Sequence, residues 1–167
     1  CRFGNYNLLH KITLERLGLD NRVDVWSPSD NNYFEGIPGG TVALAYCGFV
    51  AADILLSMRY DARPAEIQPG AVDALYEKLA NELDDLLEAQ AAKDGSVAAA
   101  AREIALKRFY GLKKFLADAA TAFKAISRPG DLPTVLVTGE IYVRCDPFAN
   151  DFVIDQIQKR GIRVKLA

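Results

Sequence analysis

The feature that most constrains the fold is an almost uninterrupted apolar segment, Thr41–Met58, which reads TVALAYCGFVAADILLSM. A segment of this length just meets the minimum for crossing a bilayer. However, Asp53 lies inside it without a basic partner in the run, and Tyr46 and Gly48 interrupt it. A helix that is buried on nearly all sides explains this pattern better than a membrane span. The sequence therefore predicts a core helix here and no membrane partner.

Composition and charge narrow the class of protein. The chain has 167 residues, enough to bury a core, and its 50% hydrophobic and 25% charged content is that of a globular protein. A net charge of -2 gives no electrostatic reason to expect nucleic acid as a partner. The three cysteines, Cys1, Cys47 and Cys145, are too scattered for a disulfide framework, which favours the cytoplasm. Because the chain opens on cysteine and stops within a predicted strand, we expect it to be a piece of a longer protein.

Two segments in the middle of the chain, Gly70–Ala92 and Ser96–Ile126, are rich in residues with high helix propensity. The turn between them offers Gly95 as a left-handed C-cap and Ser96 as an N-cap. Apolar residues spaced by three and four form a seam on the second helix, as expected for a contact with a neighbouring helix. These residues are Phe109, Leu112, Leu116, Ala119, Phe123 and Ile126. The sequence predicts a long antiparallel helical hairpin.

The segments on either side of this hairpin have the pattern of an α/β protein. A helix over Asn5–Leu17 and a strand over Val23–Ser27 are predicted before it. After it come a strand at Thr134–Thr138, a helix at Pro147–Arg160 and a strand at Ile162–Leu166. A strand, a helix and a strand with short connections predict a parallel pair.

The predicted fold class is therefore α/β, a Rossmann-like lobe with a parallel sheet and an inserted helical hairpin. In this interpretation residues 1–64 and 131–167 form the two parts of the lobe, and residues 65–130 form the hairpin.

Candidate functional residues gather after the strand at Thr134–Thr138, in the segment GEIYVRCD. Ligands of an open parallel sheet bind outside the carboxyl ends of its strands. By the same argument, Cys1–Gly4 and Pro28–Gly40 should lie at that edge, with Asp146 as the N-cap of the next helix. We expect these three segments to converge on one cleft. The candidate side chains there are Cys1, Glu140, Tyr142, Arg144 and Cys145.

The cysteines carry the metal hypothesis. Cys1 and Cys145 are both predicted at helix N-termini, where backbone N–H groups and the helix dipole favour the thiolate that binds metal. The alternatives are a terminal thiol for Cys1 and a partly buried small residue beside a cap for Cys145. Cys47 lies in the apolar helix, where a free cysteine is ordinarily buried.

Each of the other candidate residues could have a binding role or a structural one. Arg144 could bind a phosphate or a carboxylate bidentately, or it could pair with Glu140 and tie the loop together. Tyr142 could simply pack. The glycines of Gly36–Gly40 could admit an anion to the N-terminus of the following helix. The sequence leaves the catalytic residues unknown. The single histidine, His10, has no serine or cysteine at a suitable spacing, so a hydrolase triad has little support.

Two blocks resemble a known family: CRFGNYNLLHKITLERLGLDNRVDVWSPSDNNYF with the helix after it, and GEIYVRCDPFANDFVIDQIQKRGIRVKLA. They are similar to the C-terminal region of large activator-related proteins of the 2-hydroxyacyl-CoA dehydratase family. The resemblance implies Rossmann-like lobes, a cysteine-bound 4Fe–4S cluster and low-potential electron transfer to the dehydration of a CoA thioester, a reaction of anaerobic metabolism. In this resemblance Cys1 matches the family's cysteine in the block before the first helix. Together with Cys145 from the argument above it is a candidate metal ligand, and Glu140, Tyr142 and Arg144 are further candidate cofactor-binding residues. No segment matches the activator's ATPase motifs, so no ATP site is expected.

On this hypothesis the chain is one lobe of a cytoplasmic protein rather than an enzyme complete in itself. Its expected partners are the rest of its own chain, a dehydratase or redox protein, and a CoA thioester. Two alternatives stay open. One is a cofactor-free scaffold or interaction module whose hairpin docks a partner. The other is a CoA- or nucleotide-binding lobe that uses Arg144 and the glycines of Gly36–Gly40 as anion contacts.

Overall fold

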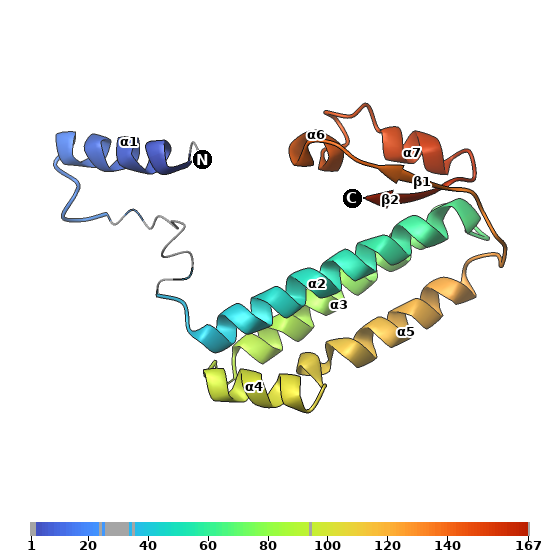
Figure 1. Ribbon diagram of the computed structural model, residues 1–167, viewed down its shortest axis with the longest axis horizontal. Coiled ribbons are helices and arrows are strands. Elements are labelled where there is room, and N and C mark those ends of the chain that lie inside the picture. Colours follow the sequence, from blue (N-terminus) through green and yellow to red (C-terminus); the bar gives the residue numbers. More distant parts are fainter. Residues whose placement is uncertain (1–2, 24, 26–33, 35, 94, 167) are drawn as a thin grey trace.

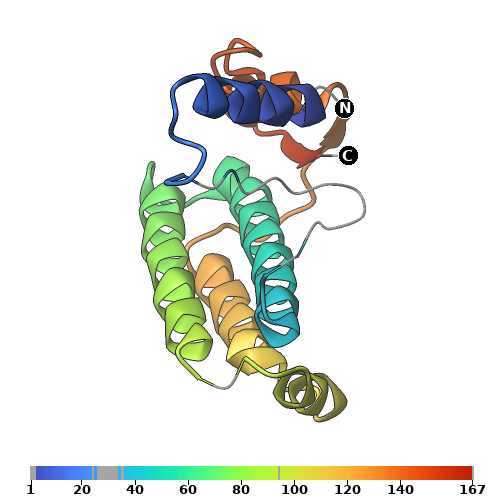
Figure 2. The same ribbon diagram turned by 90° about the vertical axis from the view of Figure 1, so that its left-hand side faces the viewer.

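Three long helices packed side by side dominate the structure, a computed structural model that describes residues 3–23, 25, 34, 36–93 and 95–166. They are α2 (Gly39–Ala62), α3 (Ala71–Ala91) and α5 (Leu112–Ala125). α2 and α5 run in the same direction and α3 runs against them, as Figures 1 and 2 show. We call these three helices the bundle.

The core of the bundle forms where small and large apolar side chains of the three helices interlock. One cluster joins Leu55 and Ala62 of α2, Val72 and Leu79 of α3, and Ala119 and Phe123 of α5. A second joins Ala51, Leu83 and Leu112. Leu55, Val72 and Ala119 are at most 1% exposed. The bundle therefore contains most of the buried apolar side chains of the described residues, and we expect it to be their most stable part.

The helix α2 confirms the predicted core helix, but not its predicted environment. Tyr46 and Phe49 are 71% and 75% exposed, and Val50 and Ile54 are also exposed. The expectation that the helix is buried on nearly all sides is therefore wrong. Its buried residues fall on the side that contacts α3, α4, α5 and β2, and an apolar stripe is left facing outward.

This stripe also bears on the membrane question. Among the described residues, one helical stretch, Gly39–Ala65, is long and apolar enough to cross a bilayer by length and composition alone. A core helix of a soluble protein can meet the same criterion. The stretch includes η1 (Arg63–Ala65), a 3₁₀ turn that continues α2 toward the C-terminal elements.

The predicted second helix of the hairpin is broken in two. Ser96 caps α4 (Val97–Ala105) as predicted, with the Ala99 amide donating to its hydroxyl at 3.2 Å. The chain then turns through η2 (Phe109–Gly111) before α5 begins. Three non-glycine residues between α4 and α5 have left-handed backbone angles: Lys107, Phe109 and Tyr110.

Glu103 and Tyr110 explain the break. The Glu103 carboxylate accepts from Arg108 Nη2 at 2.7 Å and from the Tyr110 amide at 3.2 Å, which holds the turn closed. The Tyr110 ring is buried in a cluster with Leu44 and Ala100. The predicted seam residues Leu112, Ala119 and Phe123 are buried, but α2 shares that contact, so the hairpin is part of a three-helix bundle.

A small unit follows the bundle, and we call it the βα unit. It consists of β1 (Thr134–Val137), α6 (Ile141–Cys145), α7 (Val153–Gln158) and β2 (Arg163–Leu166). The strands pair in parallel, in a register that runs from Thr134 opposite Arg163 to Val137 opposite Leu166. The two predicted strands and their parallel pairing are confirmed. The predicted helix from Pro147 begins only at Val153.

The predicted Rossmann-like α/β lobe is wrong. The described residues are mainly helical, and their sheet consists of β1 and β2 alone. The physical reason is that the apolar segment at Thr41–Met58 packs mainly against the helices of the predicted hairpin, with a smaller contact to β2. The strand predicted over Val23–Ser27 lies largely outside the described residues.

The N-terminal helix α1 (Phe3–Arg16) confirms the helix predicted over Asn5–Leu17. It is set apart from the bundle in Figure 1. Its apolar side chains Tyr6, Leu8 and Leu9 are each more than half exposed.

Candidate functional site

The segment that the sequence singled out, Gly139–Asp146, forms the short helix α6 and its two ends. Glu140 is the N-cap, and its carboxylate accepts from the Val143 amide at 3.0 Å. Tyr142 is 67% exposed. Arg144 is half-buried, and its Nε has no hydrogen-bond partner among the described residues. No side-chain ion pair joins Glu140 to Arg144 in this part of the chain.

Two residues after the helix fix the turn that follows it. The Asp146 carboxylate accepts from the amides of Phe148 and Ala149, at 2.8 and 3.1 Å. The Asn150 amide donates to the carbonyl oxygens of Val143 and Arg144, at 3.1 and 3.0 Å. Much of the polar character of this segment is therefore used in capping and turn formation.

The cysteines give little support to a cluster in the described residues. Cys1 lies outside them. Cys145 is exposed, but it is the last residue of α6 and not at a helix N-terminus as predicted, so the dipole argument for its thiolate is wrong. Cys47 is half-buried in α2, and burial raises the pKa of its thiol. The described residues contain no group of three or more histidine, cysteine or acidic side chains that could hold a metal ion. They do not by themselves fit a 4Fe–4S cluster, which takes four ligands.

Gly40, in the first turn of α2, has a packing role. A Cβ atom on Gly40 would lie 2.2 Å from the Gly95 carbonyl oxygen and 2.5 Å from that of Ser96. The backbones approach this closely only because Gly40 lacks a side chain. Two carbonyl oxygens at the start of α2 disfavour an anion there. Gly95 is not the C-cap that the sequence predicted, because α3 ends at Ala91 and Ala92 follows as its C-cap.

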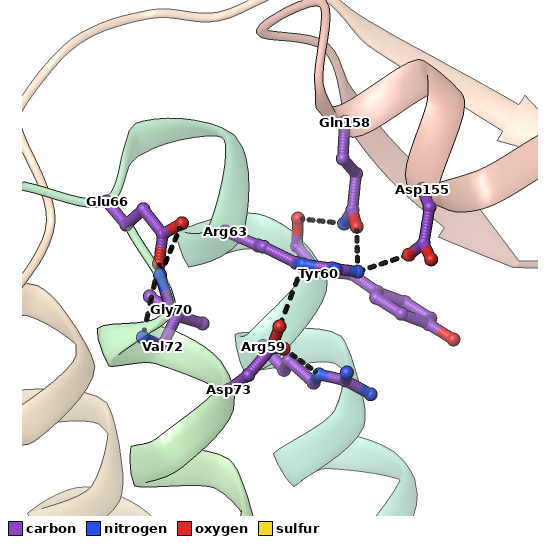
Figure 3. Close-up of polar contacts among 9 residues, drawn as sticks. All are labelled: Arg59, Tyr60, Arg63, Glu66, Gly70, Val72, Asp73, Asp155 and Gln158. Carbon is purple, nitrogen blue, oxygen red and sulfur yellow. Dashed lines mark hydrogen bonds and ion pairs between the residues drawn. The ribbon is translucent and has the colours of Figure 1, made fainter. Parts of the chain in front are cut away.

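A network of charged and amide side chains joins the βα unit to the bundle, and Figure 3 shows it. Arg63 Nη1 donates to Asp155 Oδ1 and, at 3.2 Å, to Gln158 Oε1. Its Nε lies 3.3 Å from Asp73, which also accepts from Arg59 Nε at 2.8 Å. We call these five residues the clamp.

The clamp connects elements that are distant in sequence. Gln158 is 4% exposed, and its Nε2 donates to the carbonyl oxygen of Tyr60 at 3.1 Å. Asp155 and Gln158 belong to α7, Asp73 belongs to α3, and Arg63 follows α2. Sequence reasoning missed this network, since nothing local marks residues more than ninety positions apart as partners.

A cleft of about 780 Å³ lies beside the clamp, where the bundle meets the βα unit, and we call it the junction cleft. Its walls come from α2, η1, the end of α5, the connection to β1, and both strands. They are formed by Met58, Asp61, Ala62, Ala65, Ala120, Phe123, Lys124, Ser127, Arg128, Pro129, Gly130, Thr134, Arg163 and Lys165.

The junction cleft is positively charged. Lys124, Arg128, Arg163 and Lys165 line it, with Asp61 as the acidic group in the lining. Asp61 pairs with Lys165 at 2.7 Å. None of the ion pairs among the described residues involves the other three cations. The chain has a net charge of -2, so this concentration of positive charge is local.

Two atoms in the lining lack partners. Arg163 Nη2 donates to the Gly130 carbonyl oxygen at 3.0 Å, while its buried Nε has no acceptor among the described residues. Asp61 Oδ1 is likewise buried without a donor in this part of the chain. A buried guanidinium N–H without an acceptor is costly, so an acceptor supplied by a ligand would be favourable.

A second basic hollow, of about 610 Å³, lies near the turn between α4 and α5. More of its cationic side chains have partners than in the junction cleft. Arg108 pairs with Glu103 at 2.7 Å, and Lys93 Nζ donates to Gln90 at 3.1 Å. The junction cleft is therefore the better anion site.

No family model, curated protein or solved structure matches this chain.

Proposed function

We propose that the protein is a binding lobe for a small molecule that carries phosphate or carboxylate groups, and that this ligand occupies the junction cleft. The observation that carries the proposal is the convergence of four cationic side chains, from α5, the segment after it and β2, with Asp61, the ion-pair partner of Lys165, as the carboxylate among the lining residues. Arginine presents a planar fork that matches a phosphate or carboxylate, and lysine adds a mobile charge. Side chains that are far apart in the sequence thus line one site.

Apolar side chains next to these cations favour an organic anion over a bare inorganic ion. Met58, Phe123 and Pro129 line the same cleft. Ligand sites of this size are typically apolar with a few converging polar groups. The junction cleft has that composition.

This proposal develops the CoA- or nucleotide-binding alternative, with the anion contacts moved from Arg144 to the junction cleft. The resemblance to the 2-hydroxyacyl-CoA dehydratase family remains a prediction. It would make the ligand a CoA thioester, place the protein in the cytoplasm, and make this chain one lobe of a larger protein that works with a dehydratase or redox partner. The predicted cluster has little support in the described residues, so the proposal assigns it no step.

The test is calorimetric titration of CoA and of inorganic pyrophosphate at about 50 and about 300 mM sodium chloride. We expect binding that weakens at the higher salt concentration, because part of the affinity comes from incompletely buried charges. The double variant Lys124→Gln/Arg128→Gln should bind at least tenfold more weakly, since both side chains are exposed and lack ion pairs among the described residues. The control Lys78→Gln/Arg102→Gln removes two exposed cations outside the junction cleft.

The control should stay within about twofold of the original affinity. Equal losses in both double variants would show that only net charge matters, and would contradict a site in the cleft. Failure of both anions to bind at millimolar concentration would refute the proposed function.

A second candidate function, an interaction module, is favoured by exposed apolar side chains on the βα unit. Phe148 is 86% exposed, Ile141 and Tyr142 are each 67% exposed, and Leu136 of β1 is 62% exposed. Exposed apolar side chains that gather on one surface mark contact sites in many proteins, and these four come from one small unit. Sedimentation of the chain with and without Phe148→Ser tests whether this surface associates, and an unchanged monomer in both cases would count against it.

A further inference from the structure

An apolar cavity lies between α2 and α5, the two long helices that also contribute to the junction cleft. It has a volume of about 330 Å³. Its walls are almost wholly apolar and include Tyr46, Val50, Phe109 and Leu116. The half-buried Cys47 also lines it, and burial raises the pKa of this thiol, so the wall is uncharged there at neutral pH. Such a lining suits hydrocarbon and offers little to a polar ligand.

The exposed stripe of α2 borders this cavity. Tyr46, Val50 and Ile54 follow one another by four residues, which places them on one face of the helix. Their exposed fractions are 71%, 44% and 38%. A soluble protein gains about 25 cal/mol for each Å² of such surface that is covered. The stripe and the cavity are therefore a candidate site for an apolar group.

The apolar cavity and the junction cleft follow one another along both helices. On α5, Leu116 lines the cavity and Ala120, one turn later, lines the cleft. On α2, Val50 lines the cavity and Met58 lines the cleft, with Ile54 of the exposed stripe between them. One turn is about 5.4 Å, and the two helices run in the same direction, so the two sites lie one after the other along this pair of helices. We call the two sites together the α2/α5 groove.

We propose that the ligand of this groove is a single-chain anionic amphiphile. Its carboxylate or phosphate end lies in the junction cleft near Lys124, Arg128 and Arg163, and its alkyl chain lies along the groove toward Tyr46 and Phe109. The inference rests on the proposed function, because it uses the same cleft for the charged end. It adds the class of ligand: an acyl or alkyl chain joined to an anion.

The distribution of charge selects this occupant. Cations line one end of the groove and apolar side chains line the other, with Lys113 the charged residue in the lining of the cavity. An amphiphile with a cationic end would meet repulsion in the cleft. A short anion would fill the cleft and leave the apolar section uncovered.

A chain-length series tests the inference. The probes, each below its micelle concentration, are butanoate, hexanoate, octanoate and decanoate, with decyl phosphate, acetyl-CoA and octanoyl-CoA as other carriers of the same end groups. Decyltrimethylammonium is the control of equal length and opposite charge. We expect the affinity to rise about two- to fourfold for each added methylene until the groove is filled. The cationic control should bind at least tenfold more weakly than decanoate.

Two variants on the same helix separate the groove from general effects. Tyr46→Glu places a carboxylate in the cavity wall and should flatten the chain-length dependence while short anions still bind. Phe49→Glu is the matched control, because Phe49 is 75% exposed on α2 but does not line the cavity. It should leave the dependence unchanged. Both side chains are exposed, so both variants should fold, which thermal unfolding would verify.

The outcomes separate this inference from the proposed function. If CoA and pyrophosphate bind but chain length has no effect, the inference is wrong and the anion site stands. If no probe binds, both are wrong. Equal binding of decanoate and the cationic control overturns the assignment of the charged end. A monomer produced from a dimer by Tyr46→Glu would identify the groove as an interface between two copies, and would also overturn the inference. The carrier that binds best identifies the source of the chain as a free acid, a phosphate or a CoA thioester.

Discussion

Replacing Arg63 with methionine would remove the guanidinium at the centre of the clamp and keep an unbranched side chain of similar length. In the structure this guanidinium contacts Asp155, Gln158 and Asp73, so it joins α7 to the end of α2 and to α3. The variant leaves the apolar core of the bundle intact. It therefore isolates the contribution of the clamp to the docking of the βα unit.

The magnitude follows from the exposure of each partner. The Asp155 and Asp73 side chains are 35% and 36% exposed, so water can rehydrate them when Arg63 is lost. The two partly exposed pairs together contribute roughly 1 kcal/mol to the free energy of unfolding. Gln158 is 4% exposed, and its Oε1 would lose its donor, at a cost of roughly 1 kcal/mol. We expect Arg63→Met to lower the free energy of unfolding by about 2 kcal/mol.

Urea unfolding and hydrogen exchange together measure this effect. With a slope of about 2 kcal/mol/M, the midpoint should fall by about 1 M. Amides in α7 and β2 should exchange faster than in the original protein, while those of α3 and α5 should change less. The control Lys114→Met removes an exposed pair with Asp118 on α5 and should cost less than about 0.5 kcal/mol.

Two results would refute the reasoning. An unchanged midpoint would mean that the clamp contributes nothing to stability. Equal loss of protection in α5 and α7 would mean that Arg63 supports the whole fold and not the docking of the βα unit.

Three further predictions follow from particular sites. Leu55→Ala should lower the unfolding free energy by about 3 kcal/mol, because the side chain is 1% exposed in the bundle core, and a loss below about 1 kcal/mol in urea unfolding would contradict this packing. Gly40→Ala should lower the unfolding free energy by about 2 kcal/mol in the same measurement, since the added Cβ would lie 2.2 Å from the Gly95 carbonyl oxygen. Gly130→Ala is the control and should be nearly neutral, because nothing lies within 4 Å of its Cβ position. Equal effects of the two substitutions would contradict the close contact at Gly40. Burial raises the pKa of Cys47, Tyr60 and Tyr110 in the folded protein. As the pH rises, the unfolded chain therefore loses these protons before the folded protein does. The free energy of unfolding should be steady below about pH 9 and fall above it. A urea midpoint that rises between about pH 8 and about pH 10 would show the opposite sign.

The parts of the fold that could be predicted depend on local signals. Helix formers and the Ser96 cap identified α3 and the start of α4. The order of strand, helix and strand identified the parallel pairing of β1 with β2. The break between α4 and α5 was missed because the spacing of Phe109 and Leu112 continues the seam across it. Gly111, with a φ of 87°, was the local signal for the break.

The fold class could not be read from these signals because it depends on which surfaces meet. The run at Thr134–Thr138 is apolar enough for a strand buried on both faces, as in a Rossmann-like sheet. In the structure Leu136 is 62% exposed, and the sheet of the described residues has two strands. The helix α2, predicted to be buried, instead packs on one side and leaves the other open.

The candidate functional residues also fall into two groups, those that the local sequence could identify and those that only the fold brings together. The sequence marked Gly139–Asp146 as a candidate binding segment, and the capping role that the structure shows could have been read from the positions of Glu140, Asp146 and Asn150. The junction cleft could not, because Lys124 and Lys165 become neighbours only through the docking of the βα unit. Their sequence context is that of ordinary surface cations.

The clamp and the junction cleft should depend on each other energetically. Asp61 and Arg63 are two residues apart; Asp61 pairs with Lys165 in the cleft, and Arg63 holds α7. A ligand that contacts both the end of α5 and β2 binds only the docked βα unit, so at a hundred times its dissociation constant it should stabilise that state by about 2.7 kcal/mol. This exceeds the loss expected from Arg63→Met. A saturating anion should therefore restore the protection of α7 in that variant, and protection that stays low despite measured binding would place the anion site outside the junction cleft.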